Sequence, residues 1–189
     1  MFDSLFLRVL NWEASLPKNR AREIIESLEV REGMKIADMG SGGGYFTLQF
    51  ARIVGDTGRV YAVDNNPKNL DFVRQRAKRA GLRNIVLILP IGDEVGLPEG
   101  GLDLIFARNV FHHLPEPTGY FKNLKRFLRA SGRVVVIDHK PKGGFSFTAI
   151  FKHHTPVEVI LRAMDSAGYS LMQTFDFLPD QTFNLFGVK

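Results

Sequence analysis

Three glycines at alternating positions follow an aspartate, where a strand is expected to pass into a helix. The segment reads Asp38-Met39-Gly40-Ser41-Gly42-Gly43-Gly44. Glycine leaves room for a ligand beside the backbone, and the amides at a helix N-terminus offer it a positive potential. Glycine is also the default residue of turns. Taken alone, the segment therefore predicts either a nucleotide-like ligand or a plain structural turn.

The residues around the glycines separate two ligand classes. A dinucleotide-binding loop needs glycine or alanine where this chain has Tyr45, which is too large for close approach of a pyrophosphate. Asp38 adds a carboxylate that repels a pyrophosphate but attracts the ammonium and sulfonium groups of S-adenosylmethionine. The loop therefore favours this cationic cofactor over NAD.

Two further aspartates close later strands. Asp64 follows Gly44 by about twenty residues, where an acidic side chain can accept both hydroxyls of a ribose. Asp93 is placed to accept a hydrogen bond from an adenine amino group. Each of these carboxylates, in isolation, could equally cap a turn. Because the carboxyl ends of parallel strands form the ligand crevice of an open sheet, we expect Asp38, Asp64 and Asp93 to line one pocket.

Short apolar strands alternate with amphipathic helices from residue 35 onward, which predicts an α/β fold with a parallel sheet wrapped by helices. The expected strands are residues 35–39, 59–63, 85–89, 102–107, 132–137, 170–178 and 182–188. The strand at 85–89 is continuously apolar, as in a strand buried on both faces. Asn66-Pro67 begins a helix, another carries Phe121 to Leu128, and Thr155 to Glu158 read as a capping box with proline at the first helical position. Pro179-Asp180 predicts a turn that makes the last strand antiparallel to its neighbour.

Length and composition predict one compact unit. The chain has 189 residues, 44% of them hydrophobic, and no cysteine. We expect a single domain over residues 1–189, with residues 1–30 as an N-terminal helical cap or lid. Asp3 and Arg8 interrupt the apolar start, so neither a signal peptide nor a membrane span is expected, and a cytoplasmic protein is the default. The lack of cysteine excludes thiolate metal sites and cysteine nucleophiles.

The net charge of +5 would suit an anionic partner, but the basic residues are spread along the chain. The densest cluster, residues 74–79, reads as the solvated face of a helix. Nucleic acid is therefore not the expected partner. The apolar face of residues 2–12 could cap a pocket, touch a membrane surface or pair two copies as a homodimer.

Several segments taken together resemble the successive motifs of class I S-adenosylmethionine-dependent methyltransferases. They are the glycine loop, Tyr61-Ala-Val-Asp64, Gly92-Asp93, Val110-Phe-His-His-Leu114 and Leu128-Arg-Ala-Ser-Gly-Arg-Val-Val-Val-Ile-Asp138. The nearest group is the ubiquinone/menaquinone-biosynthesis and arsenite methyltransferase-like branch. The resemblance runs from about residue 20 to the end, with the motifs in the family's order. It implies a Rossmann-like, doubly wound sheet of seven strands, mostly parallel with an antiparallel last strand.

The resemblance also implies a role for individual residues in binding S-adenosylmethionine. Asp38 and Gly40 would meet the methionine end, Asp64 the ribose and Asp93 the adenine. The other expected contacts are Gly42, Gly44, Asn65, Ile91, Gly92 and Asn109, the last near the methionine moiety. Two departures concern turns: Ala130-Ser131-Gly132 replaces the usual Pro-Gly-Gly, and Gly43 stands where threonine or cysteine is common.

The sequence gives less information about the methyl acceptor than about the cofactor. Asn109-Val110-Phe111-His112-His113 differs from the motif of enzymes that methylate amino groups of bases or glutamine, which argues against such an amino group as the acceptor. The resemblance to small-molecule class I methyltransferases implies a small-molecule acceptor. His112 or His113 could be a general base, the alternative being a packing or capping role at a helix start. No metal site is expected, because the histidine pair at 153–154 lies in an extended segment where neighbouring side chains diverge. Two other functions remain open: a non-catalytic partner subunit that binds the cofactor, and an RNA methyltransferase.

Overall fold

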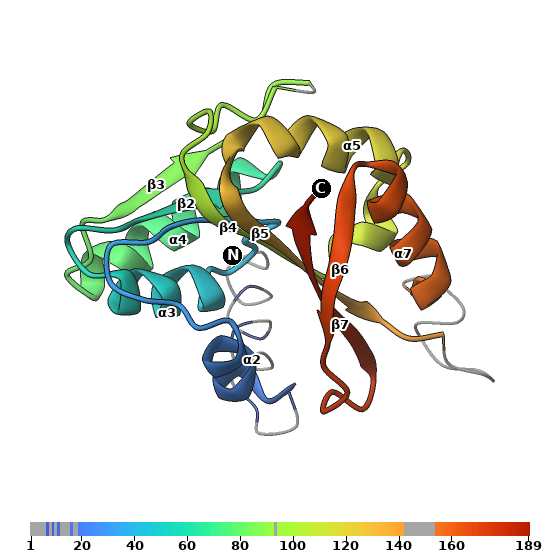
Figure 1. Ribbon diagram of the computed structural model, residues 1–189. Helices are drawn as coiled ribbons and strands as arrows, with labels where there is room; N and C mark the ends of the chain where they lie inside the picture. The colour runs from blue at the N-terminus through green and yellow to red at the C-terminus, as the bar shows by residue number, and fades with distance from the viewer. Residues whose placement is uncertain are drawn as a thin grey trace. The chain divides into compact units, whose positions relative to one another are not determined.

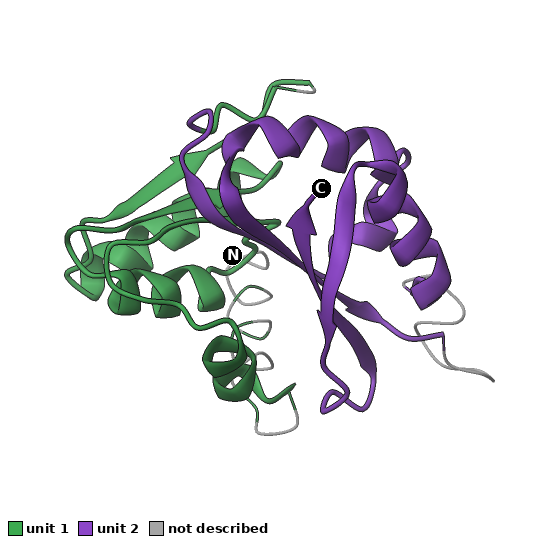
Figure 2. Cartoon of the chain, viewed as in Figure 1, with its two compact units in different colours: residues 1–97 green, residues 98–189 purple. Residues whose placement is uncertain are grey.

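The computed structural model describes Leu7, Val9, Asn11, Leu16 and residues 19–92, 94–141 and 154–189. Predictions for most of residues 1–18, for Asp93, for residues 142–152 and for His153 lie outside these. The chain divides into two compact units, Met1–Leu97 and Pro98–Lys189 (Figure 2). A single domain with residues 1–30 as a helical cap or lid stays a prediction. Within the described residues, no helix combines the length and apolar character that crossing a bilayer would need.

Seven strands and five α-helices build the described part of the fold (Figure 1). The strands are β1 Lys35–Met39, β2 Arg59–Val63, β3 Ile85–Ile88, β4 Leu102–Arg108, β5 Leu128–His139, β6 Tyr169–Thr174 and β7 Gln181–Val188. The described α-helices are α2 Ala21–Ser27, α3 Tyr45–Val54, α4 Pro67–Arg79, α5 Pro117–Leu124 and α7 Val157–Ser166. The strand order is β3-β2-β1-β4-β5-β7-β6.

The first unit contains three parallel strands with their helices. β1 pairs with β2 and β2 with β3, each in parallel register. Leu48 of α3, Ala62 of β2 and Val73 of α4 form one buried cluster, so both helices cover the same face of β2. α4 begins as predicted at Asn66-Pro67, where the Asn66 side chain accepts a hydrogen bond of 3.0 Å from the Lys68 amide.

The second unit combines parallel and antiparallel pairing. β4 and β5 run parallel, whereas β7 is antiparallel to both β5 and β6. The turn at Pro179-Asp180 therefore reverses the chain as expected. The predicted seven-stranded sheet, mostly parallel with an antiparallel last strand, is confirmed.

Some expectations about elements are wrong. β3 stands at the end of the strand order and is only half-buried, with Val86 exposed, because just one neighbouring strand covers it. β5 starts at Leu128, which pairs with Leu102 of β4, so the helix that was to include Leu128 ends earlier, at Leu124 and a 3₁₀ turn. The capping box is absent: Pro156 is the N-cap residue of α7, and no side chain caps that helix.

A buried tyrosine ties α5 to β6 in the second unit. The hydroxyl of Tyr169 donates a hydrogen bond of 3.0 Å to the carbonyl oxygen of Phe121, and both side chains are buried. Burial raises the pKa of this phenol. The hydroxyl therefore stays protonated and acts as the donor in this contact.

We expect Tyr169→Phe to lower the free energy of unfolding by about 1 to 2 kcal/mol, because the buried Phe121 carbonyl loses its donor. Urea denaturation measures the change. Tyr61→Phe is the matched control, because the hydroxyl of this half-buried tyrosine of β2 makes no hydrogen bond to any of the described residues. Equal destabilisation by the two substitutions would contradict the assignment.

Candidate functional site

The glycine loop joins β1 to α3 in a left-handed course. Gly40, Gly42 and Gly44 all have positive φ, at 64°, 51° and 74°. Gly44 is the N-cap residue of α3, and a Cβ there would lie 2.7 Å from a methyl carbon of Val73. Only glycine satisfies both the backbone and the packing at this position. The predicted strand-loop-helix arrangement is thus present.

Asp64 connects the end of β2 to the glycine loop. One carboxylate oxygen accepts a hydrogen bond of 2.8 Å from the amide of Gly42, and the other accepts from the Asn66 amide at 2.9 Å and the Asn69 side chain at 3.1 Å. The side chain is only 7% exposed. Three N–H donors stabilise a carboxylate that faces the loop.

Asp38 is the more deeply buried carboxylate, at 4% exposure. The Thr47 hydroxyl of α3 donates a hydrogen bond of 2.5 Å to it. Burial raises the pKa of Asp38 to about 7, partly offset by the Thr47 hydrogen bond and reinforced by the negative charge of Asp64. The first unit therefore holds two interacting carboxyls beside the glycine loop, at the carboxyl ends of adjacent parallel strands.

Gly43 makes contacts that explain its departure from the family pattern. Its carbonyl oxygen accepts hydrogen bonds from the Asn11 side chain at 2.8 Å and from the Arg76 guanidinium of α4 at 2.7 Å. The Asn11 side chain also donates to the carbonyl of Leu7. A Cβ on Gly43 would lie 2.1 Å from the Asn11 amide nitrogen. Asn11 therefore occupies the space that a larger side chain would need.

The remaining predicted contacts of this unit lie in turns. Asn65 is exposed directly after Asp64. Ile91 is 82% exposed and forms an isolated bridge with Glu94, and Gly92 has a positive φ of 59°. Asp93 lies outside the described residues. The structure brings Asp38, Asp64 and the glycine loop together in one network, whereas no hydrogen bond between described residues joins the 91–92 turn to them.

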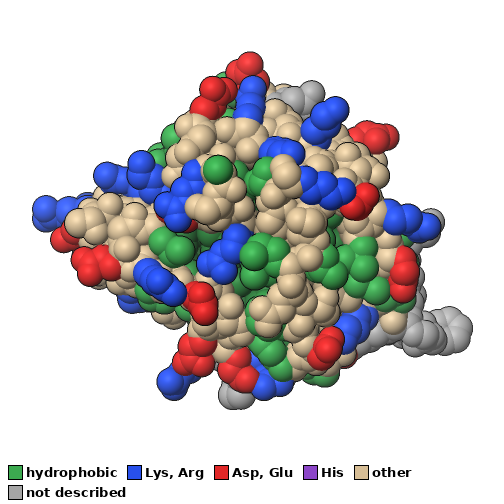
Figure 3. All heavy atoms as spheres, viewed as in Figure 1, with side chains coloured by type: hydrophobic (Ala, Val, Ile, Leu, Met, Phe, Trp, Pro, Cys, Tyr) green, Lys and Arg blue, Asp and Glu red, His purple; other side chains and the backbone are tan. Residues whose placement is uncertain are grey.

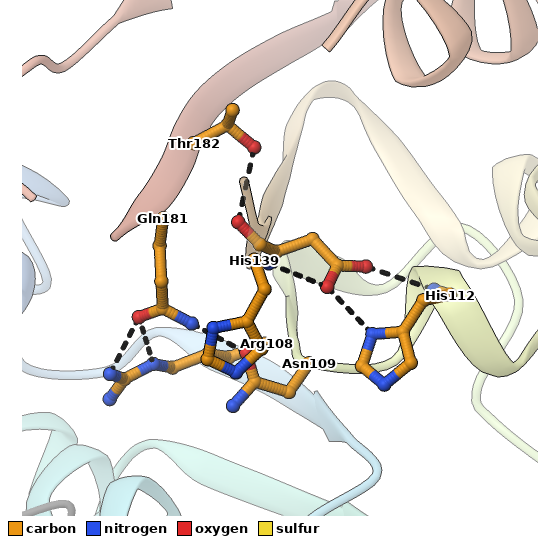
Figure 4. A network of polar contacts seen from close by, with 7 residues as sticks. Arg108, Asn109, His112, His139, Gln181 and Thr182 are labelled. Carbon is orange, nitrogen blue, oxygen red and sulfur yellow. Dashed lines mark hydrogen bonds and ion pairs between the residues drawn. The ribbon is translucent and has the colours of Figure 1, made fainter. Parts of the chain in front are cut away.

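Asn109 follows β4 in the second unit and has an unusual backbone. Its φ is 58°, rare for a residue with a side chain. Its amide donates to the Ile137 carbonyl at 2.8 Å, and its side-chain oxygen accepts a hydrogen bond of 2.5 Å from Gln181. Gln181 in turn accepts from Arg108 at 2.8 Å (Figure 4). This network holds Asn109 in a strained conformation, which is often found at functional sites.

His112 contacts a carboxylate that the sequence did not single out as a site residue. Asp138, at the end of β5, is 0% exposed and lies 2.7 Å from His112 Nδ1. It also accepts hydrogen bonds from the backbone amides of His112 at 2.9 Å and His139 at 2.8 Å. The strand-end position that singled out Asp38 and Asp64 was the signal that could have found Asp138.

Three imidazoles gather around this contact. The ring centroid of His113 lies 4.0 Å from that of His112, and the His139 centroid lies 6.3 Å from it. His113 is exposed, whereas the His112 side chain is only 5% exposed. In the part of the chain that the structure describes, no three histidine or acidic residues are arranged to hold a metal ion.

Comparisons with known proteins agree on one family. The profile of the "Methyltransferase domain" family matches residues 30–160. A protein-L-isoaspartate O-methyltransferase from Methanothrix thermoacetophila is 33% identical over 129 residues, covering 67% of this chain and 57% of the relative. A ubiquinone/menaquinone biosynthesis C-methyltransferase UbiE from Shewanella halifaxensis is 28% identical over 118 residues, covering 62% and 47%. The chain thus spans about half the length of these curated relatives.

A solved structure extends the likeness to the whole chain. A SAM-dependent methyltransferase from Aquifex aeolicus superposes with a TM-score of 0.88, covering 100% of both chains at 21% sequence identity. At this identity the likeness concerns the fold. It agrees with the Rossmann-like sheet that the motifs implied.

The raised pKa of Asp38 predicts a pH dependence of stability without ligand. Between its ordinary pKa of 3.8 and its folded value of about 7, the folded chain holds a proton that the unfolded chain has released. This group therefore makes the free energy of unfolding fall as pH rises through that interval, with no further change above it. Urea denaturation across the interval should show a flatter profile for Asp38→Asn. An unchanged profile in that variant would count against the burial effect.

The contact between Gly43 and Asn11 predicts a non-additive pair of substitutions. Gly43→Ala should cost about 1 to 3 kcal/mol of stability from overpacking, because φ of Gly43 is not in the left-handed region and only the contact is unfavourable. The cost should shrink in an Asn11→Ala background, which thermal unfolding of all four variants measures. Gly119→Ala in α5 is the control, since a Cβ there meets nothing within 4 Å. Simple additivity of the two substitutions would refute the contact.

Proposed function

The chain belongs to the methyltransferase domain family, whose methyl donor is S-adenosylmethionine, and we propose that it transfers a methyl group from this donor to a small-molecule acceptor. One observation carries the proposal. Two buried carboxyls, Asp38 and Asp64, stand at the ends of adjacent parallel strands and flank a glycine loop with positive φ angles.

The chemistry of this donor set fits a cationic ligand with a ribose. The pKa of Asp38 is raised to about 7 because a buried carboxylate has lost its hydration, and a bound ammonium group would restore a favourable environment for the charged form. The hydroxyl of Ser41 in the glycine loop is buried and has no hydrogen-bond partner among the described residues. A polar ligand in the loop would satisfy it, as buried polar groups require.

We assign the cofactor contacts as the motifs imply. Asp38 and Gly40 hold the methionine end, Asp64 the ribose hydroxyls, and Asp93 the adenine amino group. Gly42, Gly44, Asn65, Ile91, Gly92 and Asn109 complete the set. When bound, S-adenosylmethionine supplies an electrophilic methyl group, so the chain's own task is to align the acceptor with it.

The acceptor is the part of the proposal that the relatives leave open. The names of the two curated relatives refer to protein L-isoaspartate and to ubiquinone or menaquinone, which are chemically different. On the face drawn in Figure 3, Lys and Arg side chains are interspersed with Asp and Glu side chains. This mixture gives no support to an extended polyanion as the acceptor, so we retain a small molecule.

We expect Asp64→Asn to weaken binding of S-adenosylmethionine by about 1.5 to 3 kcal/mol, because a charged acceptor for the ribose hydroxyls is lost. Isothermal titration calorimetry measures the affinity. Asp71→Asn is the matched control, since Asp71 pairs with Arg74 on the exposed side of α4. Wild-type affinity in Asp64→Asn would refute the ribose assignment, and no binding by the unmodified protein would refute the proposed function.

Turnover separates the proposal from its two alternatives. Methyl transfer from labelled S-adenosylmethionine to members of a small-molecule library supports it. Cofactor binding without transfer to any acceptor, together with a stable complex in pull-down, would instead indicate a non-catalytic partner subunit. Salt-sensitive RNA binding with transfer to RNA would indicate an RNA methyltransferase.

A further inference from the structure

A pocket opens between α4 and the edge strand β3, entirely within the first unit. The two elements lie side by side at the end of the sheet (Figure 1). This α4–β3 pocket has a volume of about 410 Å³, and its floor is formed by the apolar side chains of Ala77, Leu82, Ile85 and Leu87. The last three are half-buried and pack against the buried cluster that holds α3 and α4 on β2. A concave apolar floor of this size is typical of a binding site.

The backbone of β3 is open along the side that borders this pocket. β3 pairs with β2 alone, and the carbonyl oxygens of Asn84 and Ile88 accept hydrogen bonds of 2.9 Å and 3.2 Å from β2 and the residue that follows it. Because successive residues of a strand direct their backbone groups to opposite edges, those of Ile85 and Leu87 point away from β2. A row of unpaired amides and carbonyls is a template for a further strand.

Basic side chains surround the apolar floor. Arg74 and Lys78 lie one turn apart on α4, and Arg83 stands just before β3. Arg74 forms an ion pair with Asp71, whereas Lys78 and Arg83 have no ion-pair or hydrogen-bond partner among the described residues. The α4–β3 pocket is therefore positively charged.

This charge distinguishes between possible occupants of the edge. If two copies of the chain paired through β3, the basic side chains of both pockets would meet at one interface, and like charges that face each other destabilise strand pairing. An acidic segment would instead be attracted to Lys78 and Arg83. A polyanion without a peptide backbone could not pair with the open amides and carbonyls of Ile85 and Leu87 in strand register.

We propose that the α4–β3 pocket binds an extended acidic segment of another protein, which adds to β3 as a further strand. Its backbone pairs with Ile85 and Leu87, its apolar side chains rest on the floor, and its acidic side chains meet Lys78 and Arg83. Main-chain pairing of this kind supplies affinity, and the pocket beside the strand supplies specificity. The proposal does not depend on the proposed function, because none of these residues belongs to the assigned cofactor contacts.

Hydrogen exchange of single amides, followed by nuclear magnetic resonance, tests the strand pairing. The probe is an eight-residue peptide with two glutamates at each end and the centre Ile-Thr-Val-Thr, blocked at both termini. We expect it to slow exchange of the Ile85 and Leu87 amides, while the Val86 and Ile88 amides, which face β2, serve as internal controls. The same peptide with N-methylated backbone amides keeps its side chains but lacks donors, and it should give no protection.

A charge reversal tests the role of the basic side chains. Lys78→Glu should raise the dissociation constant of the peptide about fivefold, because an attraction is replaced by a repulsion. Arg79→Glu is the matched control: it makes the same charge change at the neighbouring exposed residue of α4, which does not line the pocket, and should change the constant less than about twofold. Both variants should bind S-adenosylmethionine as the wild type does.

Four results would overturn the proposal. They are unchanged exchange of Ile85 and Leu87 at millimolar peptide, equal binding of a peptide with lysine in place of glutamate, tighter binding of an oligouridylate that depends on Lys78, and protection of the two amides by self-association without peptide. The third would indicate a nucleic-acid surface, and the fourth an interface between copies of the chain. Failure to bind S-adenosylmethionine would overturn only the proposed function.

Discussion

The need to satisfy buried carboxylates shapes both units of the chain. Asp64 and Asp138 each stand at the carboxyl end of a strand, and each accepts hydrogen bonds from two backbone amides and one side chain. Three of these amides, those of Gly42, Asn66 and His112, lie in segments that follow strands, and the fourth belongs to His139, the last residue of β5. Each carboxylate therefore fixes the path of a loop as well as supplying charge. The same contacts that stabilise the fold position the groups that could do chemistry.

The hydrogen bonds between backbone amides and a buried carboxylate have a different role in each unit. In the first unit they order a glycine loop whose amides and carboxyls suit a cationic ligand. In the second they hold the imidazole of His112 and the loop that follows β4. Asp38 behaves differently: it accepts hydrogen bonds from the Thr47 hydroxyl and backbone amide, and burial nevertheless raises its pKa to about 7.

Local patterns in the sequence predicted much of the fold. The bounds of β1 and β2 agree with expectation, because each apolar run is closed by glycine or aspartate. The exposure of β3 could not be read from its residues, since it depends on the strand's place at the sheet edge. The early start of β5 could not be predicted either. Residues 129–131 lie in the register irregularity between the pairs Leu102–Leu128 and Leu104–Arg133, and they have no run of large apolar side chains that would indicate a strand.

The parts of the candidate site that depend on residues close together in the sequence could be predicted. Glycines and strand-end acids follow from the chain's own spacing, so Asp38, Asp64 and the glycine loop were found. Asn11 and Arg76 were missed, because they reach Gly43 across 32 and 33 residues and belong to no periodic pattern. The role of Thr47 was also missed, because it depends on the contact of this side chain with a buried carboxyl in the folded chain.

The contact between Gly43 and Asn11 bears on how this chain can be engineered. Replacing a residue by the one most frequent in its family is a common route to stabilisation. In this chain the threonine that is common at position 43 would collide with Asn11. The substitution would therefore lower the stability, and the residue frequencies of the family do not show this. Positions 43 and 11 therefore have to be changed together. A larger residue at position 43 requires a smaller residue at position 11.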